Sequence, residues 1–367
     1  MKVLHVLYCG LGGHGNVFFS MLKADADKGI EYEALFYGIE NLRTDYIEQC
    51  SSNHINWNFA QKKPGFDLKY YRQILHFIKK SNPDIVFLHG SAYILPSKIA
   101  SLLSAKKYRV VVRETQANHL KTKAQWITLC IAMLLADKIV CLTKEFKEQI
   151  KAKIKFFYRD KKVVVIPNGI DLDLYKPKLN NAADVFYIGM QSRIVSIKDH
   201  TTLLKAFALI KKSGKIPTGQ IIKLKIAGDG DFKEQLIRLA NELEINSDVE
   251  FTGMLNEENL VQFLQSLHLY VHASLGETMS TAVMQAMGCG LPIIASDVNG
   301  INNMIDNGRT GILVPAKNEQ LMAEALIACI TNLVLRQSLA ANALKFSKDN
   351  FSSQAMLKAY KAQAFIN

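Results

Sequence analysis

The chain has 367 residues, 49% of them hydrophobic and 21% charged, a composition typical of a globular protein long enough for two domains with full cores. No apolar run reaches 18 residues and the six cysteines form no CxxC pair. These patterns argue against a membrane-spanning helix and a zinc site, and they favour a reduced, cytoplasmic protein. Most of the formal net charge of +12 lies in residues 1–172. An anionic partner is therefore expected, either lipid or nucleic acid, unless the charge serves only solubility.

Strand and helix patterns alternate along the first half of the chain. The N-terminus enters a strand pattern directly and has no signal-peptide features. Alternation of this kind predicts a parallel, doubly wound α/β sheet. The expected strands are 2–8, 32–37, 84–89, 109–113, 137–142 and 163–166, and the expected helices are 17–26, 68–80, 94–103 and 124–135.

A second α/β series follows a break in the pattern. Residues 167–171 form a turn motif and residues 176–184 are polar, so we expect an N-terminal domain of residues 1–172 and a second domain of residues 173–350. A final helix at about 351–367 is expected. The second domain should contain strands 185–190, 223–227, 249–252 and 269–272 and helices 201–212, 232–243 and 257–265.

The most informative segment is 276–296. It predicts an acid, Glu277, at the start of a short helix that ends in a glycine-rich turn and leads into a buried strand. Helix N-termini bind phosphate, and a carboxylate would repel it, so Glu277 is expected to bind sugar hydroxyls. The alternative is an acid that only stabilises the helix dipole. With the first role, the segment suits a ligand that is part sugar and part diphosphate.

This segment resembles the signature of retaining glycosyltransferases of family 4, which have the GT-B fold. In the family a Glu is followed, after seven residues, by a second Glu, where this chain has Gln285. Residues 167–171, 227–230 and 251–253 match further landmarks of the family. The resemblance implies two Rossmann-like domains facing a cleft, with the sugar donor in the second domain, the acceptor in the first, and the last helix returning to the first domain.

The resemblance also implies the donor-site residues. Glu277 would orient the sugar, and Arg193 and Lys198 would stabilise the leaving diphosphate without a metal ion. Gln285 would contact the ribose less strongly than the family's Glu. The remaining donor-binding positions would act largely through backbone groups: Gly228, Gly230, Gly253, Met254, Met279, Ser280 and Thr281.

A glycine-rich loop at 10–15 follows the first strand and has the form G-x-G-x-x-G. A nicotinamide cofactor would require an acid at the end of the second strand, where Tyr37 stands. By resemblance, Gly12 and Gly13 lie near the donor phosphate. A tight turn that needs small residues is the alternative.

Five residues of the first domain are candidates for catalysis or for acceptor binding. Arg113 and Glu114 end and follow a strand, and His119 comes shortly after, where the resemblance places catalytic and acceptor-side groups. His89 ends another strand and His14 follows the glycine loop. Each single histidine has a purely structural role as its alternative.

Residues 144–162 are rich in lysine, with Phe146, Ile150, Ile154, Phe156 and Phe157 interleaved. This pattern predicts peripheral contact with anionic lipid. It could also bind nucleic acid, but no nucleic-acid motif accompanies it, so that partner is not expected.

The resemblance implies transfer of a sugar from a nucleotide diphosphate sugar, UDP-linked rather than GDP-linked. The acceptor would be a lipid-linked saccharide or a lipopolysaccharide or capsule precursor at the inner face of a bacterial membrane. No cofactor or metal is expected. Gln285 leaves open a silent partner subunit, and the glycine loop leaves open a nicotinamide-dependent oxidoreductase.

Overall fold

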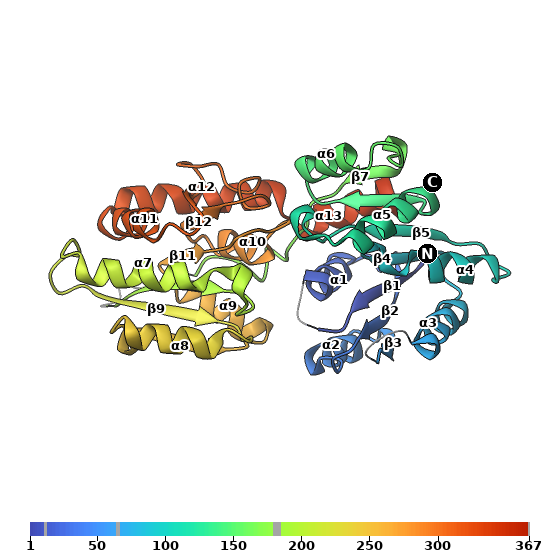
Figure 1. Cartoon of the computed structure of the whole chain (residues 1–367), viewed down its shortest axis with the longest axis horizontal. Helices are drawn as coiled ribbons and strands as arrows, with labels where there is room; N and C mark the ends of the chain where they lie inside the picture. Colours follow the sequence, from blue (N-terminus) through green and yellow to red (C-terminus); the bar gives the residue numbers. More distant parts are fainter. Residues whose placement is uncertain (11–12, 64–66, 179–184, 366–367) are drawn as a thin grey trace. The chain divides into compact units, whose positions relative to one another are not determined.

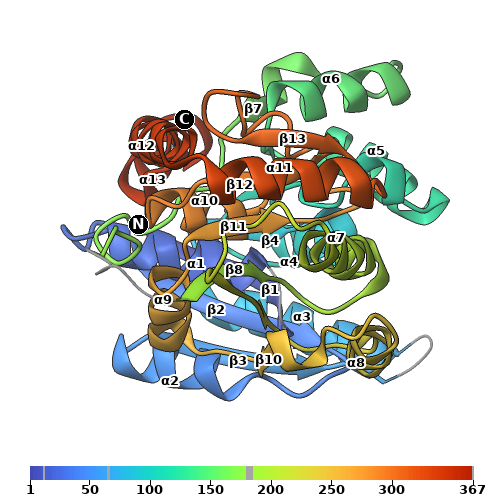
Figure 2. The same ribbon diagram turned by 90° about the vertical axis from the view of Figure 1, so that its left-hand side faces the viewer.

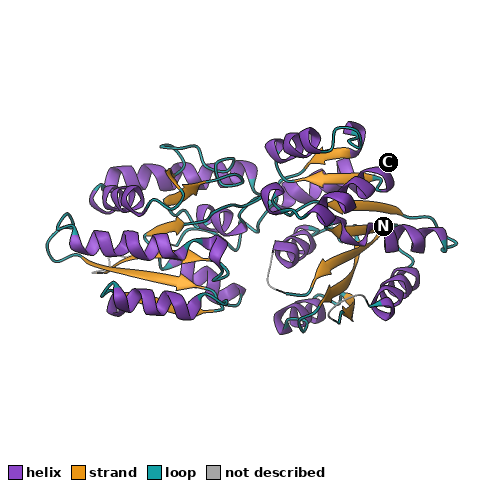
Figure 3. Ribbon diagram, viewed as in Figure 1, coloured by secondary structure: helices purple, strands orange, loops and turns teal. Residues whose placement is uncertain are grey.

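The computed structural model describes residues 1–10, 13–63, 67–178 and 185–365. They form two compact units, one of Met1–Gly169 with Ser353–Asn367 and one of Ile170–Ser352 (Figure 1). The observed division falls three residues before the boundary expected at 172. Each unit is an α/β layer structure with one sheet (Figure 3).

Unit 1 has a seven-stranded sheet in the order β3-β2-β1-β4-β5-β6-β7, and every neighbouring pair is parallel. This is the doubly wound arrangement that the alternating pattern predicts. The strands are β1 (Lys2–Tyr8), β2 (Glu31–Gly38), β3 (Asn56–Gln61), β4 (Ile85–His89), β5 (Arg109–Arg113), β6 (Lys138–Cys141) and β7 (Val163–Val165).

Helices cover both faces of this sheet because alternate strand residues point to opposite sides. In β1, Leu4 and Val6 join a core under one group of helices, and Val3 and Leu7 join the core on the other face. The first face carries α3 (Leu68–Ser81), α4 (Ile94–Leu102), α5 (Lys123–Leu135) and α6 (Lys144–Lys153). The second carries α1 (Gly13–Ala24), α2 (Thr44–Ser52) and α13 (Ser353–Tyr360).

The C-terminal segment returns to unit 1, in line with the expectation for residues 351–367. Helix α13 and the π-helical turn Lys361–Phe365 bury Met356 and Tyr360 against α1 and β4. The Gly169 N–H donates to Met356 Sδ at 3.0 Å, which ties the chain's exit from the unit to its re-entry.

Unit 2 has a six-stranded parallel sheet in the order β10-β9-β8-β11-β12-β13. Its strands are β8 (Val185–Gln191), β9 (Ile221–Ala227), β10 (Val249–Gly253), β11 (Leu269–His272), β12 (Ile293–Asp297) and β13 (Ile312–Pro315). Its helices are α7 (His200–Lys212), α8 (Lys233–Glu242), α9 (Glu257–Gln265), α10 (Thr281–Gly288), α11 (Glu319–Thr331) and α12 (Leu333–Asn350).

Each sheet has a point at which the winding reverses, between β1 and β4 in unit 1 and between β8 and β11 in unit 2 (Figure 2). In open parallel sheets, ligands bind outside the carboxyl ends of the strands at such a switch point. The topology therefore directs attention to the residues that follow β1, β4, β8 and β11.

The structure adds elements that the sequence did not predict and corrects the start of two helices. The unpredicted elements are α2, β3, α6, β13, α11 and α12, and the edge strand β3 buries fully only Ala60 and lacks an apolar run. Helix α1 begins at Gly13 rather than at 17, and Gly15 within it leaves the space that the Tyr46 ring occupies. Helix α10 begins at Thr281, so Glu277 precedes the helix instead of opening it.

Among the described residues, no single helix is long and apolar enough to cross a membrane. One pair passes such a test together, α11 with α12, but it is bent by 100° at its break.

Candidate active site

Glu277 lies at the switch point of unit 2, in the loop between β11 and α10. Its Oε1 contacts Lys198 Nζ and lies 3.0 Å from His272 Nε2. The side chains of Lys198 and Glu277 are each 14% exposed. Lys198 comes from the turn after β8, so the two strands that flank the switch point supply the pair. The sequence predicted both residues as functional but not their contact.

The pair fixes the charge of Glu277. Burial alone would raise the pKa of this carboxyl, but the Lys198 ammonium and the His272 hydrogen bond outweigh burial and hold the pKa at about 2. The carboxylate is therefore ionised at every physiological pH. Its Oε2 has no hydrogen-bond partner among the described residues and can accept a bond from a ligand hydroxyl.

His272 is the last residue of β11 and is fully buried. A carboxylate only accepts hydrogen bonds, so the bond to Glu277 requires the proton on Nε2 of His272. The Tyr270 hydroxyl lies 3.3 Å from Nδ1 of the same ring. Burial lowers the pKa of His272. A neutral imidazole therefore donates the hydrogen bond that holds the Glu277 carboxylate.

Three hydrogen bonds to backbone carbonyls hold the loops that carry this group. The Ile197 carbonyl, next to Lys198, accepts the Leu275 N–H at 2.8 Å and the Ser274 hydroxyl at 3.2 Å. On the other side, the Glu277 N–H donates to the Asn299 carbonyl at 3.2 Å. Gly300 has φ +84°, and a Cβ there would clash with the Glu277 and Thr278 carbonyls.

Gln285 lies on α10 and is buried. Its Oε1 accepts a hydrogen bond from Gln191 Nε2 at 2.7 Å, and its amide also bonds to the Tyr175 hydroxyl. The position where the resemblance expects a ribose-binding Glu is thus held by groups of the same unit. Neither Gln191 nor Tyr175 was singled out from the sequence.

Arg193 is exposed in the loop after β8 and forms no ion pair with another described residue. Arg193 and Lys198 both follow β8, and this shared position is the only part of the predicted pair that the described residues show. The glycines at 228 and 230 have φ +134° and +154°, and a Cβ at either would clash with the carbonyls of Ser192 or Ile194. These glycines allow two backbone loops to pack closely against each other on either side of Arg193.

The first turn of α10 provides backbone donors beside Glu277. Ser280 is its N-cap, and the Ser280 hydroxyl accepts the Val283 N–H at 3.4 Å. The Ser280 N–H is directed at Met304 Sδ at 3.3 Å. Of the predicted N–H groups from Met279 to Thr281, the one at Thr281 opens the helix and has no intrahelical acceptor.

Gly253 ends β10 and Met254 follows it, at the same edge of the sheet as Glu277. Gly253 has φ +73° with no atom near its would-be Cβ, and Met254 is exposed. The open surroundings leave room for a ligand to approach this backbone.

Three histidines meet at the switch point of unit 1. His5 Nδ1 lies 3.1 Å from His89 Nε2, and the rings of His89 and His14 are 5.4 Å apart between centroids. Burial and then the charge of Arg113 lower the pKa of His5 and of His14 to about 3, and burial lowers that of His89 as well. All three are neutral at pH 7. His5, inside a strand, was not predicted.

Arg113 pairs in register with His89, because these residues end the adjacent strands β5 and β4. It is fully buried, and its Nη2 donates to Asn168 Oδ1 at 2.5 Å. Glu114 is buried beside it, 3.6 Å from Lys121 Nζ. The structure thus brings together the predicted residues His14, His89, Arg113 and Glu114. Buried Nδ1 atoms of His14 and His89 lack a hydrogen-bond partner among the described residues.

His119, the predicted catalytic histidine, lies exposed in a 3-10 turn at Asn118–Leu120. No contact among the described residues links it to the histidines at the switch point. Gly13 opens α1, and Gly12 lies outside the described residues.

The basic stretch 144–162 differs from its prediction. Phe146, Ile150 and Ile154 are buried in the core instead of available to lipid, because α6 packs on β6 and β7. Only Phe156 and Phe157 of the five interleaved residues are exposed. Acids also lie in the stretch, and Asp160 pairs with Lys147 at 3.1 Å.

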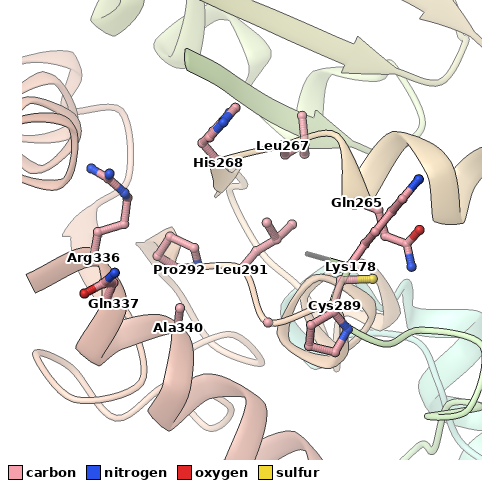
Figure 4. A pocket seen from close by; sticks show the side chains of 12 residues that line it. Lys178, Gln265, Leu267, His268, Cys289, Leu291, Pro292, Arg336, Gln337 and Ala340 are labelled. Atoms are coloured by element: carbon pink, nitrogen blue, oxygen red, sulfur yellow. The ribbon is translucent and has the colours of Figure 1, made fainter. Parts of the chain in front are cut away.

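A pocket of about 220 Å³ lies in unit 2 away from Glu277 (Figure 4). It is lined in part by Leu267 and His268, which precede β11, and by Leu291 and Pro292, which precede β12. It therefore lies at the amino ends of the strands, the opposite edge from the switch-point residues. Among the described residues no cluster of three or more His, Cys, Asp or Glu could hold a metal ion.

Two family models match the chain. The model described as Glycosyltransferase Family 4 matches residues 11–174, and the model described as Glycosyl transferases group 1 matches residues 172–346. The matches divide the chain near the observed unit boundary. Lys198, Glu277 and Gln285 lie within the second match.

Curated relatives point the same way. The UDP-Gal:alpha-D-GlcNAc-diphosphoundecaprenol alpha-1,3-galactosyltransferase of Escherichia coli is 26% identical over 287 residues, 73% of this chain and 72% of that protein. The lipopolysaccharide core biosynthesis glycosyltransferase LpsE of Rhizobium meliloti is 22% identical over 98% of both chains. An uncharacterized glycosyltransferase of Methanocaldococcus jannaschii is 28% identical over 62% of this chain, and the match spans 57% of that protein.

Solved structures share the architecture. HepE of Anabaena, in complex with UDP and glucose, superposes with a TM-score of 0.81 at 19% identity, over 99% of this chain and 98% of that chain. The lipopolysaccharide outer core galactosyltransferase WaaB, in its apo form, gives 0.71 at 19% identity over 100% and 99%. With family models matched from residue 11 to residue 346 and two parallel-sheet units, the chain is a glycosyltransferase of the GT-B fold.

Proposed function

We propose that the protein is a retaining glycosyltransferase that moves a sugar from a UDP-sugar to a lipid-linked saccharide of the lipopolysaccharide or capsule type. The observation that carries the proposal is the group of Glu277, Lys198 and His272 at the switch point of unit 2. Two relatives support the choice of UDP and of acceptor. One is a UDP-Gal:alpha-D-GlcNAc-diphosphoundecaprenol galactosyltransferase and the other a lipopolysaccharide core biosynthesis glycosyltransferase.

In this proposal Glu277 binds the donor sugar. Its Oε1 is held by Lys198 and His272, so the carboxylate is oriented before substrate arrives and Oε2 is left to accept sugar hydroxyls. Preorganised groups of this kind need no rearrangement at the moment of reaction.

Lys198 serves two groups. An ammonium has three N–H donors, so the bond to Glu277 leaves two for the diphosphate. Arg193 is exposed and unpaired among the described residues, and it adds a second cation for the charge that develops as the diphosphate leaves. We expect these cations and the first turn of α10 to support departure without a metal ion.

Retention follows if the acceptor hydroxyl attacks from the face that the diphosphate leaves. The bond from the acceptor oxygen to the anomeric carbon forms as the bond to the phosphate oxygen breaks, and the departing phosphate takes the hydroxyl proton. Neutral His14 and His89 in unit 1, with the fixed charge of Arg113, are the proposed acceptor-side groups.

The test is a transfer assay with a panel of UDP- and GDP-sugars and a lipid-linked acceptor. A Glu277→Gln variant should lose on the order of 10²-fold in kcat/KM, whereas Glu234→Gln, an exposed acid on α8, should behave as wild type. Anomeric configuration of the product is read by NMR. Inverted product would overturn retention, and turnover with GDP-sugars alone would overturn the choice of base.

A further inference from the structure

Helix α4 exposes large apolar side chains on successive turns. Leu95, Ile99 and Leu102 are spaced i, i+4 and i+7, which places them on one side of the helix, and Leu103 extends that side. All four are exposed, Leu102 by 77%. The opposite side, which includes Ile94, is buried in the core under the sheet.

Helix α5 has the same property. Ile127 and Leu134 are exposed, Ile127 by 61%, whereas Leu129 and Met133 on the other side are buried. Within Lys123–Leu135, the lysine at its start is the only charged residue. The solvent-facing side of a surface helix ordinarily carries charged and polar residues, so this composition needs a reason other than exposure to water.

The two exposed sides belong to one surface. Helices α4 and α5 pack against each other on the same face of the sheet, and Ser91 Oγ, just before α4, lies 3.2 Å from Thr128 Oγ1. Because both helices bury their other sides in one core, both exposed sides turn away from the sheet. We call the following residues the apolar face: Leu95, Ile99, Leu102, Leu103, Ile127 and Leu134.

Cations border the apolar face where α5 ends. Lys162 Nζ donates to the Leu134 carbonyl at 2.7 Å. Burial lowers the pKa of Lys162, Asp137 opposes this, and Lys98 and Arg159 lower it further, so the three cations lie within electrostatic reach of one another. Asp137 pairs with Lys98 at 3.0 Å and offsets part of their charge.

An aromatic residue accompanies these cations. Phe156 is 92% exposed, and its carbonyl accepts a hydrogen bond from Arg159 Nη1 at 3.0 Å. This part of the basic stretch, unlike the buried Phe146, is available to a partner.

We propose that the apolar face, together with Lys98, Arg159, Lys162 and Phe156, docks on an anionic lipid bilayer. Apolar side chains enter the boundary between headgroups and acyl chains, and the cations bind lipid phosphates. Charge selects this occupant, because a second copy docked through the same surface would bring like charges together. Contiguous exposed apolar surface rimmed by polar groups is typical of such interaction sites.

This surface keeps Phe156, Arg159 and Lys162 of the basic stretch 144–162 and assigns the apolar contact to α4 and α5. It complements the lipid-linked acceptor of the proposed function, but vesicle binding needs neither donor nor acceptor. The two proposals can therefore fail separately.

The test is co-sedimentation of the full chain with vesicles of phosphatidylcholine alone or with phosphatidylglycerol added. Wild type should bind the anionic vesicles and release at high salt. Leu102→Gln with Ile127→Gln should weaken binding about tenfold or more, since apolar insertion is lost. The matched control is Leu333→Gln with Val334→Gln, two exposed apolar residues of α12 in unit 2.

Charge is tested in the same way. Arg159→Gln with Lys162→Gln should weaken binding to anionic vesicles, whereas Lys151→Gln with Lys153→Gln on α6 should weaken it less. A UDP thermal shift and far-UV circular dichroism check that each variant is folded. Equal binding by the apolar-face variant and its control would overturn the proposal. The proposal would also be overturned if wild type did not bind vesicles but formed dimers, and if the apolar-face variant lost those dimers.

Discussion

Gln191 Nε2 donates to Gln285 Oε1 at 2.7 Å and joins the last residue of β8 to the middle of α10. Both side chains are buried. The amide at 285 is thus part of the internal support of the site, in a position where the family resemblance implies a carboxylate that grips ribose.

Replacing Gln285 by Leu should destabilise the protein by about 1–3 kcal/mol, because the Gln191 amide would be left buried without its acceptor. Urea unfolding measures the loss. The double variant Gln191→Leu with Gln285→Leu should cost less than the sum of the two single changes, since neither amide is then left alone. Strict additivity would contradict a direct bond.

Gln285→Glu should be tolerated, because the Gln191 amide and the Tyr175 hydroxyl can both donate to a carboxylate. Charge-assisted hydrogen bonds are stronger than neutral ones. A carboxylate at position 285 should therefore bind the ribose hydroxyls more tightly, and we expect the affinity for UDP to rise several-fold. Thermal shift against UDP concentration gives the affinity. Weaker UDP binding in this variant would show that the ribose does not reach position 285.

Sequence patterns predicted the fold well where strands are buried runs, as in β4 and β11, and where helices have a clear apolar spacing, as in α3. They failed at α2 and at β3, where the polar composition hides the pairing of β3 with β2, and they did not predict α6, α11, α12 or β13.

The site was predicted in part. Glu277 and Lys198 were identified by resemblance, but their contact joins residues 79 positions apart and depends on which strands flank the switch point. His272 was read only as the end of a strand. A polar residue at the carboxyl end of a buried parallel strand, as His89 also is, was the available signal. Gln191, the partner of Gln285, carries the same signal at the end of β8, but nothing in the sequence indicates that its partner lies 94 residues away.

His272→Asn should lower kcat/KM with a smaller effect on UDP binding, because Glu277 keeps Lys198 but loses its second support. A loss of about tenfold is expected. The control is His268→Asn, a half-buried histidine that precedes β11 at the opposite edge of the sheet. Equal losses in the two variants would indicate a general packing effect and contradict a positioning role.

The pKa of Glu277, about 2 against its ordinary value of 4.5, makes a stability prediction. A carboxyl whose pKa is depressed by folding stabilises the protein above pH 4.5, and this contribution is lost as pH falls toward 2. The difference in unfolding free energy between wild type and Glu277→Gln should therefore shrink over that range. Urea titrations at successive pH values measure it, and a constant difference would contradict the paired carboxylate.

His89→Asn should reduce transfer by about 10²-fold if His89 acts on the acceptor side, with UDP binding unchanged because the donor groups lie in unit 2. His119→Asn distinguishes the two histidine candidates. Its ring is exposed and unlinked to the switch point, so we expect near wild-type transfer. A large loss at His119 with none at His89 would reverse this assignment.

Gly300→Ala tests the backbone behind Glu277. Its φ of +84° disfavours any side chain, and its Cβ would also clash with the Glu277 and Thr278 carbonyls. Gly308 is a matched control, since it has φ +78° but no atom within 4 Å of its would-be Cβ. Gly308→Ala should therefore cost only the conformational strain, about 1 kcal/mol. Gly300→Ala should cost more in urea unfolding and should also weaken UDP-sugar binding, because the loop that orients the carboxylate must move. Equal costs with unchanged donor binding would show that Glu277 does not depend on this close approach.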